Sequence, residues 1–157
     1  MNKQRRNEKG FTMIELIIVV AIMGILAAIL VPSFASMSRK SRLTSDIRTL
    51  QTIQKQIDLY YAERGTYPTP AGTMTDGGEI GAQVGSLLVQ EGYIDSKYFS
   101  NHVATNALDL QTENAEAAWD SDKAHAVISS GAITDTKVLS IINNIAAASG
   151  EDADWLE

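Results

Sequence analysis

A long uninterrupted apolar run near the N-terminus constrains this chain more than any other feature. Leu16 to Val31 contains 16 consecutive apolar or small residues, and Phe11 to Val31 spans 21 residues. At about 1.5 Å per residue, a helix of this length covers about 31 Å, which matches the ~30 Å hydrocarbon core of a bilayer. A helix in the core of a water-soluble domain would carry a polar stripe, and this run has none. We therefore predict a membrane-spanning helix.

Charge divides the 157-residue chain into a basic leader and an acidic body. Residues 1–10 carry four basic side chains and one acidic side chain, whereas the rest carries nine basic and 18 acidic ones. A short basic leader before an apolar run is typical of exported and membrane-inserted proteins. It favours a single-pass protein with a cytoplasmic N-terminus and an extracytoplasmic head. The acidic body argues against direct nucleic-acid binding, and the lack of cysteine excludes disulfides and cysteine nucleophiles.

Two processing routes fit this layout. A conventional signal peptidase would cut after the apolar run, before Ser36, and would release a secreted binding module. Alternatively, cleavage between Gly10 and Phe11 leaves the apolar helix on the mature chain and creates an α-amine four residues from Glu15. Only the second route gives a purpose to Glu15, because a charge in an apolar membrane segment is costly.

The segment GFTMIELIIVVAIMGILAAILVPSF resembles the N-terminal signature of type IV pilins and type II secretion pseudopilins. In that family a prepilin peptidase cuts after the glycine and N-methylates the new first residue. The matching positions are Gly10 for cleavage, Phe11 for methylation, Glu15 as the fifth mature residue, and Pro32. The resemblance implies an α/β fold of the α+β, pilin-like kind. In such a fold a long N-terminal helix packs on a small C-terminal head, which has an antiparallel sheet and one or two extra helices.

The resemblance also implies a function. The chain is expected to be a structural subunit of a type IV pilus-like filament and not an enzyme. A major or minor pseudopilin of a type II secretion system is the alternative, and a DNA-uptake pilus subunit comes third. The implied partners are further copies in a homo-oligomeric filament, the prepilin peptidase, an assembly platform, and minor pilins or pseudopilins. The implied location is the inner or cytoplasmic membrane before assembly, and a pilus or pseudopilus at the cell envelope or surface afterwards.

Four residues are expected to serve assembly: Phe11, Glu15, Gly24 and Pro32. We expect Glu15 to pair with the Phe11 amine of an adjacent subunit and so to set the axial register, although an acid that merely caps the helix start is the alternative. Gly24 lies on a small-xxx-small face that lets helices approach closely. Pro32 removes one helical hydrogen bond, so we predict a kink or local melting around residues 24–33.

Beyond Pro32, apolar residues recur every three or four positions and predict that the helix continues to Arg64, where Gly65 suits a left-handed C-cap. The chain then divides into four parts. They are the cleaved leader at 1–10, the membrane and assembly half of the helix at 11–32, its amphipathic half at 33–64, and the globular head at 65–157.

Within the head, residues 65–81 are rich in Gly, Thr and Pro and predict a surface loop. Ile80–Glu91 is expected to form a short helix that ends at Gly92. Alternating polarity predicts strands at Val103–Leu110 and Ala124–Ser129. The last predicted element is a helix at Thr134–Ser149.

Few residues suit a cofactor or metal. His102 and His125 have no ligand spacing around them and are expected to be a loop and a strand histidine. In the acidic tail, Asp152 and Asp154 are calcium candidates, because Ca²⁺ takes oxygen ligands. The glycine-rich lead-in that precedes such a site in the family is absent here, so a solvated tail without a cofactor is the expectation.

Overall fold

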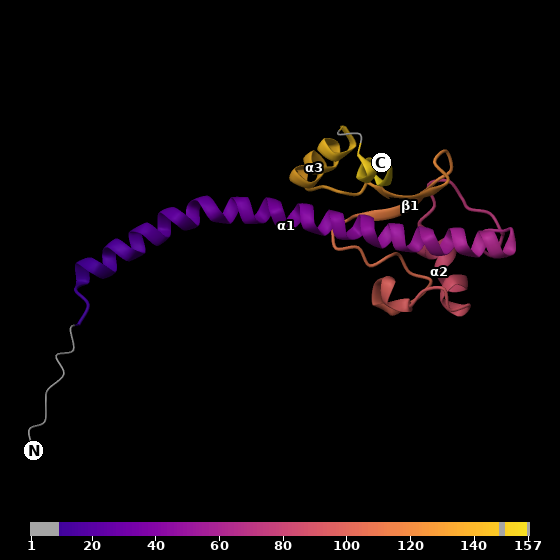
Figure 1. Ribbon diagram of the computed structural model, residues 1–157, viewed down its shortest axis with the longest axis horizontal. Coiled ribbons are helices and arrows are strands. Elements are labelled where there is room, and N and C mark those ends of the chain that lie inside the picture. Colours follow the sequence, from indigo (N-terminus) through magenta and orange to yellow (C-terminus); the bar gives the residue numbers. More distant parts are fainter. Residues whose placement is uncertain (1–9, 148–149, 157) are drawn as a thin grey trace, which may run out of the picture. The chain divides into compact units, whose positions relative to one another are not determined.

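The computed structural model of the protein describes residues 10–147 and 150–156, so the predicted leader lies outside the described residues except for Gly10. The chain divides into two compact units, one that ends at Met37 and one that begins at Ser38. The elements in chain order are α1 (Met13–Arg64), α2 (Ile80–Gln90), the 3₁₀ turns η1 (Ser96–Tyr98) and η2 (Ser100–His102), β1 (Glu116–Asp120), β2 (His125–Ser129), α3 (Thr136–Ala147) and the 3₁₀ turn η3 (Glu151–Trp155) (Figure 1). This is the predicted α+β arrangement, with a long N-terminal helix, a small antiparallel sheet and further helices.

The first part of α1, in the N-terminal unit, is apolar all round. Every large apolar side chain between Phe11 and Met37 is exposed, each by 49% or more. This part of α1 is long and apolar enough to cross a membrane. Residues 24–33 are all helical, so the local melting predicted beside Pro32 is not found. Pro32 has no N–H to donate, but the hydrogen bonds of the neighbouring turns keep the backbone helical there.

The second part of α1 supplies one wall of the core in the C-terminal unit. Its buried apolar residues are Leu43, Ile47, Leu50, Ile53, Ile57 and Tyr60. Because they recur every three or four residues, they lie on one face of the helix, as the sequence predicted. The helix ends at Arg64, since Gly65 adopts a φ of +72° and its N–H donates to the Tyr61 carbonyl oxygen at 2.8 Å. This is the predicted left-handed cap.

Strands β1 and β2 form a two-stranded antiparallel sheet in which Ala118 pairs with Val127. The Asp120 carboxylate accepts hydrogen bonds from the N–H groups of Asp122 and Lys123 and so shapes the turn between the strands. These bonds, that of Lys123 above all, lower the pKa of Asp120. The predicted strand at Ala124–Ser129 is confirmed as β2, and the predicted helix at Thr134–Ser149 is confirmed as α3, although residues 148 and 149 lie outside the described residues.

The predicted strand at Val103–Leu110 is wrong. In this segment only Leu108 makes a β-type pair, an isolated bridge to Phe99, and Val103 is 46% exposed. The reason is a close approach of the segment to α2. A Cβ atom at Gly85 would lie 2.0 Å from the Ala104 carbonyl oxygen, so the irregular chain packs against the bare helix backbone there. An extended strand could not follow this path.

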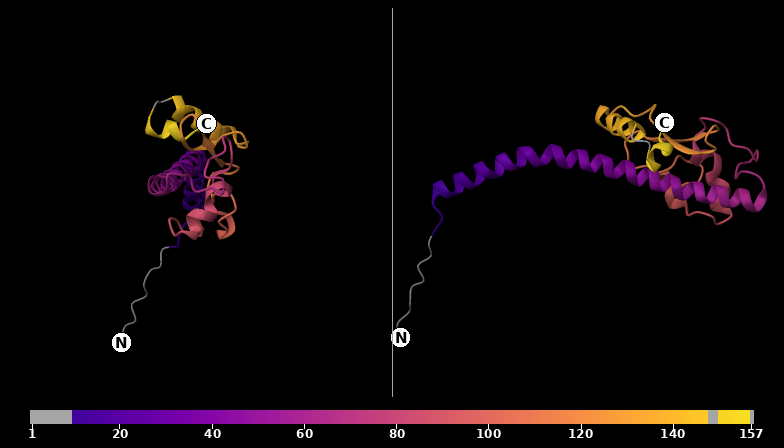
Figure 2. Two further views of the ribbon diagram at one scale, coloured as in Figure 1. Left: turned by 90° about the vertical axis from the view of Figure 1, so that its right-hand side faces the viewer. Right: turned by 45° about the horizontal axis from the view of Figure 1, so that its top comes forward.

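The core of the C-terminal unit joins α1 to α2, to the sheet and to α3. In Figure 1, α2 lies on one side of the C-terminal part of α1, and the sheet with α3 lies on the other; the views in Figure 2 agree. Fully buried members of this cluster include Leu50 and Ile53 of α1, Leu88 of α2 and Ile128 of β2. Helix α2 begins at Ile80, as predicted. It packs against the apolar face of α1 that the sequence pattern predicted.

Two polar side chains of α1 tie the helix to distant backbone. Asp46 is 1% exposed, and its two carboxylate oxygens accept hydrogen bonds from the N–H groups of Gln111 and Thr112, at 2.7 and 2.8 Å. The amide oxygen of Gln54 accepts a hydrogen bond from the N–H of Ala126 at 3.0 Å. Since a buried polar group must be paired, each contact fixes one segment of the head against one turn of the helix.

Replacing Gly85 tests the close approach of α2. We expect Gly85→Ala to lower the free energy of unfolding by about 1–3 kcal/mol or more, because the new methyl group would overlap the Ala104 carbonyl oxygen. Gly131→Ala is the matched control, since its nearest heavy atom is 3.6 Å away, and a change within about 0.5 kcal/mol is expected. Urea unfolding of the full chain in detergent, followed by Trp fluorescence, measures both. Equal midpoints for the two variants would contradict the packing described.

Replacing Asp46 tests the tie between α1 and residues 111–112. We expect Asp46→Ala to lower the free energy of unfolding by about 3 kcal/mol, since two buried N–H groups lose a charged acceptor. Asp109→Ala removes an exposed carboxylate and is the control, with little expected effect. The same urea titration reads both variants, and a loss below about 1 kcal/mol for Asp46→Ala would contradict a structural role for the carboxylate.

Candidate functional site

The bond between Gly10 and Phe11 lies in a short non-helical segment that directly precedes α1. Both residues are exposed, and Phe11 is 90% exposed. A peptidase binds its substrate in an extended conformation, so a bond inside a helix would first have to unwind. The predicted cleavage position therefore lies where the backbone is already free of helical hydrogen bonds.

Glu15 and Thr12 form a reciprocal cap at the start of α1. The carboxylate oxygen Oε2 of Glu15 accepts hydrogen bonds from the N–H and the hydroxyl of Thr12, each at 2.8 Å. In return the N–H of Glu15 donates to the Thr12 hydroxyl oxygen at 3.3 Å. This is a capping box, and it places the acid where the positive end of the helix dipole favours it. The alternative of a helix-capping acid is thus realised within the single chain.

Both hydrogen bonds to the carboxylate converge on one oxygen. Within the described residues, the second oxygen of Glu15, Oε1, accepts no hydrogen bond and joins no ion pair. A carboxylate has about four lone-pair directions. The cap therefore leaves Glu15 able to take a further donor.

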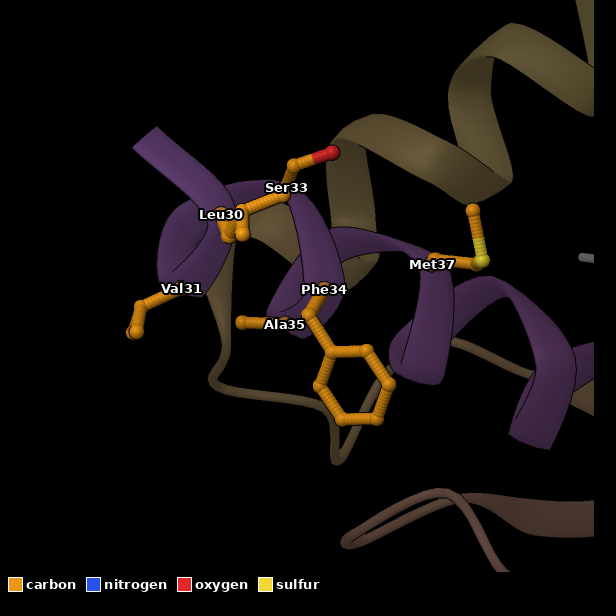
Figure 3. Close-up of a pocket in the computed structure, with 6 residues that line it drawn as sticks. All are labelled: Leu30, Val31, Ser33, Phe34, Ala35 and Met37. Atoms are coloured by element: carbon orange, nitrogen blue, oxygen red, sulfur yellow. The ribbon is translucent and has the colours of Figure 1, made fainter. Parts of the chain in front are cut away.

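The remaining residues of the predicted assembly set lie on the exposed apolar part of α1. A Cβ atom at Gly24 would meet no atom within 4 Å, so this small position has no neighbour in the single chain. Around Pro32 the helix surface has an open apolar hollow. Its lining residues are Leu30, Val31, Ser33, Phe34, Ala35 and Met37 (Figure 3). This part of the helix thus presents bare apolar surface on which another apolar surface can pack.

The other candidate residues lie apart from this segment. His102 is exposed in η2 with a φ of +57°. His125 is the first residue of β2, and its ring centroid lies 4.7 Å from that of Trp155. The predictions of a loop histidine and a strand histidine are therefore confirmed. The two calcium candidates, Asp152 and Asp154, are exposed in η3. Among residues 10–147 and 150–156, no three His, Asp or Glu side chains are grouped to hold a metal ion.

Thr12 is the functional residue whose role the sequence reading missed. It is part of the motif Thr-x-x-Glu, and that spacing is the signature of a capping box. The signal was therefore present in the sequence, which left a helix-capping acid open as the alternative for Glu15 but did not identify Thr12 as its partner.

Comparisons with known proteins agree with this geometry. The family described as the prokaryotic N-terminal methylation motif matches residues 5–31. The type IV major pilin protein PilE1 of Neisseria gonorrhoeae is 30% identical over 122 residues, which cover 71% of this chain and 74% of that protein. A fimbrial protein of Neisseria meningitidis serogroup B is 33% identical over 99 residues, or 61% of this chain and 58% of that protein. Type II secretion system core protein G of Pseudomonas aeruginosa is 38% identical over 66 residues, or 42% of this chain and 46% of that protein.

The chain spans 46–59% of the length of four of the pilins and fimbrial proteins of Neisseria that it matches. No solved structure matches it. A long N-terminal helix with a methylation motif, followed by a small α+β head, defines the pilin-like class of protein. The chain belongs to the family of type IV pilins and type II secretion pseudopilins.

Replacing Thr12 tests the cap. We expect Thr12→Val to destabilise the first turn of α1 by about 1 kcal/mol, because the valine keeps the shape but loses the hydroxyl. Faster hydrogen exchange at the Glu15 and Leu16 amides of the uncleaved chain in detergent micelles measures the loss. Thr44→Val is the control, since its hydroxyl bonds only to the Lys40 carbonyl oxygen. Unchanged exchange in Thr12→Val would contradict the capping box.

Proposed function

We propose that this protein is a structural subunit of a type IV pilus-like filament and performs no catalysis itself. The observation that carries the proposal is the segment from Phe11 to Met37, whose large apolar side chains are all exposed. Such a surface is unstable in water and needs either lipid or other apolar helices around it. A filament built around bundled copies of the same helix satisfies this need after the subunit has left the membrane.

Before assembly the same helix anchors the chain in the inner or cytoplasmic membrane. We place the N-terminus in the cytoplasm and the head outside it, because the basic leader is the first and shortest flank of the apolar run. The assembled subunit then lies in a pilus or pseudopilus at the cell envelope or surface. The partners are other copies of the chain, the prepilin peptidase, an assembly platform and minor subunits.

Processing at Gly10–Phe11 precedes assembly in this proposal. The peptidase removes residues 1–10, and the new α-amine of Phe11 becomes N-methylated. The match of residues 5–31 to the methylation motif and the non-helical backbone at this bond support the proposed position. Cleavage leaves the N–H of Thr12 in place, so the cap on Glu15 survives it.

Glu15 then serves as the acceptor for the Phe11 amine of an adjacent subunit. A charged side chain in the middle of a membrane helix costs about 2.5–3.5 kcal/mol. The capping box offsets part of that cost in the single chain. The open Oε1 atom offers the place for a cation, and an uncompensated charge in an apolar bundle is strongly unfavourable. Only one axial register brings the two charges together, so the pair aligns neighbouring subunits.

Gly24 and Pro32 assist packing in this proposal. Gly24 has open space around it, which lets a second helix approach the backbone closely. Pro32 lacks the N–H that would hold residues 24–33 firmly in a helix. The helix could therefore lengthen there when subunits are pulled into a filament.

A subunit of a type II secretion pseudopilus is the second candidate. The 38% identity to the secretion core protein G over 66 residues favours it. Deletion of the gene separates the two, since loss of long surface fibres indicates a pilin and retention of secreted proteins inside the cell indicates a pseudopilin.

Two variants of Glu15 test the ion pair. Glu15→Gln keeps an acceptor for Thr12 but removes the charge, whereas Glu15→Val removes both. We expect both variants to insert into the membrane and both to lose filaments at least tenfold, because neither can neutralise the neighbouring amine. Electron microscopy and the amount of subunit in a sheared surface fraction measure assembly.

Two controls complete this test. Glu116→Gln removes an exposed charge on β1 and should leave filaments unchanged. Mass spectrometry of the mature chain should show N-methyl-Phe11 in the wild type. Normal filaments from Glu15→Gln would contradict the ion pair and leave Glu15 with the role of a helix cap. A mature N-terminus at Ser36 would contradict the filament subunit and indicate a secreted module.

A further inference from the structure

One side of α1 in the C-terminal unit carries two exposed cations, Arg48 and Lys55. They lie seven residues apart, which is two helical turns or about 10.5 Å, so both project from the same side of the helix. Arg48 is two residues from the fully buried Leu50, and Lys55 is two residues from the fully buried Ile57. Two residues turn a helix by about 200°, so both cations point away from the core of the head.

These two cations have no anionic partner in the part of the chain that the structure describes. A cation on a solvated helix commonly pairs with an acid three or four residues away. No acid lies at those distances from Arg48. Asp58 lies three residues from Lys55, but its carboxylate accepts a hydrogen bond from the amide of Gln54 at 2.8 Å instead. The two positive charges are therefore left for a partner outside the helix.

The side chains next to these cations favour contact with another protein surface. The hydroxyl of Thr52 donates to the Arg48 carbonyl oxygen at 2.9 Å, so its hydrogen already has an acceptor. Leu59, one turn beyond Lys55, is apolar and 45% exposed. We call Arg48, Thr52, Lys55 and Leu59 the basic face. A surface that covers it must above all supply anions, because a charge removed from water needs a counter-charge.

The rest of the head supplies anions in excess. Residues 65–157 carry three basic and 14 acidic side chains, a net charge of −11, whereas residues 38–64 carry six basic and three acidic ones. Residues 98–122 contain no Lys or Arg. Within them, Asp109 and Glu113 are exposed, and neither joins an ion pair among the described residues. Glu113 borders a small cavity together with Arg42 but is not paired with it. We call residues 109–113 the acidic segment.

The basic face and the acidic segment lie on opposite sides of α1. The N–H groups of Gln111 and Thr112, inside the acidic segment, donate to the carboxylate of Asp46 at 2.7 and 2.8 Å. Asp46 is buried on the core side of the helix, and Arg48 lies two residues, or about 200°, further round. One copy of the chain therefore cannot pair its own basic face with its own acidic segment.

We propose that the basic face of one copy docks on the acidic segment of a neighbouring copy in the filament. Arg48 and Lys55 then pair with Asp109 and Glu113 of that neighbour, and the guanidinium matches a carboxylate with two parallel hydrogen bonds. Contact between two different surfaces of identical chains repeats from copy to copy without closing on itself, as a filament requires. The docking rests on the proposed function, since it needs copies that stand side by side.

Charge selects a second copy as the occupant. Heads with a net charge of −11 over residues 65–157 repel one another when a filament brings them together. Each copy carries the basic face that offsets this repulsion, on the side that its own acidic segment leaves open. An unrelated acidic partner would cover the basic face but would leave the repulsion between heads in place.

Charge reversal tests the docking. The basic-reversed chain carries Arg48→Glu and Lys55→Glu, and the acid-reversed chain carries Asp109→Lys and Glu113→Lys. Each should lower the amount of subunit in the sheared surface fraction at least fivefold, because like charges then meet between copies. A chain with all four substitutions should return to within twofold of the wild type, since the two surfaces are again complementary.

Co-expression of the basic-reversed and the acid-reversed chains shows whether the charges meet between copies. One chain then presents acids on both surfaces and the other presents cations on both, so alternating copies can pair. We expect mixed filaments at no less than half the wild-type amount. A folding defect in either chain would not be repaired in this way, so this arm separates docking from stability.

Two single reversals elsewhere in the head are the matched controls. Lys137→Glu changes an exposed cation on α3, and Asp122→Lys changes an exposed acid in the turn between β1 and β2. Both should leave the amount of filament unchanged. A loss equal to that of the basic-reversed chain would show that only the total charge of the head matters, and would overturn the docking.

Cross-linking tests the contact directly, because the chain has no cysteine of its own. Thr52→Cys places a thiol on the basic face and Gln111→Cys places one on the acidic segment, and all four charges remain. With a short bismaleimide added to cells, a chain that carries both should give a ladder of cross-linked copies. Each substitution alone should give no dimer, since like surfaces do not meet. Thr52→Cys combined with Ser140→Cys on α3 is the control and should give no ladder.

The outcomes separate this docking from the proposed function. Normal filaments from both reversed chains, or no ladder in wild-type filaments, would overturn the docking and leave the filament subunit in place. A wild type without filaments would overturn the filament subunit, and the ladder in membranes would then decide the docking alone. If the basic-reversed chain loses filaments and neither the four-substitution chain nor co-expression restores them, another partner, such as an anionic lipid, covers the basic face and the second copy is overturned.

Discussion

One helix has to satisfy two different environments, and the rest of the structure depends on this constraint. Up to Met37, α1 has apolar side chains on every side, whereas from Leu43 onward only one face is apolar and buried. The first part is stable only among lipids or other helices, and the second part only against the head. Since the head is small, it cannot build a full core without the wall that α1 supplies.

Polar contacts specify how the head is fixed to that wall. An apolar stripe alone determines which face of the helix packs against the head. Because its residues recur at every turn, it discriminates only weakly between axial positions that differ by one turn. Asp46 and Gln54 lie two turns apart on α1, and each accepts hydrogen bonds from a different distant segment of the head. Displacement of the helix would leave buried N–H groups and a buried carboxylate unpaired at once, which would be far costlier than lost apolar contact. These two side chains therefore set the register of the helix against the head.

The elements that the sequence predicted are those that local pattern determines. The stripe from Leu43 to Tyr60 and the cap at Gly65 follow from helical spacing and from the freedom of glycine. Strand β1 was missed, because its sequence EAAWD holds no β-branched residue. It is extended because β2 pairs with it along one edge, and because Trp119 exchanges hydrogen bonds with Gly77 and Gly78 along the other. Contacts across such distances leave no local signal, and the same holds for the carboxylate of Asp46.

Glu15 shows why an acid, and no other side chain, suits the start of this helix. A glutamine at this position would accept the hydrogen bonds of Thr12 equally well but could not neutralise a cation. A lysine could pair with a charge but would be repelled by the helix dipole. The carboxylate has two oxygens, and Thr12 occupies only Oε2. The cap and the proposed intersubunit pair therefore do not compete, so the acid can stay bound to its own helix while a neighbour arrives. In the proposed filament, the amine therefore adds a counter-charge to a carboxylate that already has hydrogen-bond partners.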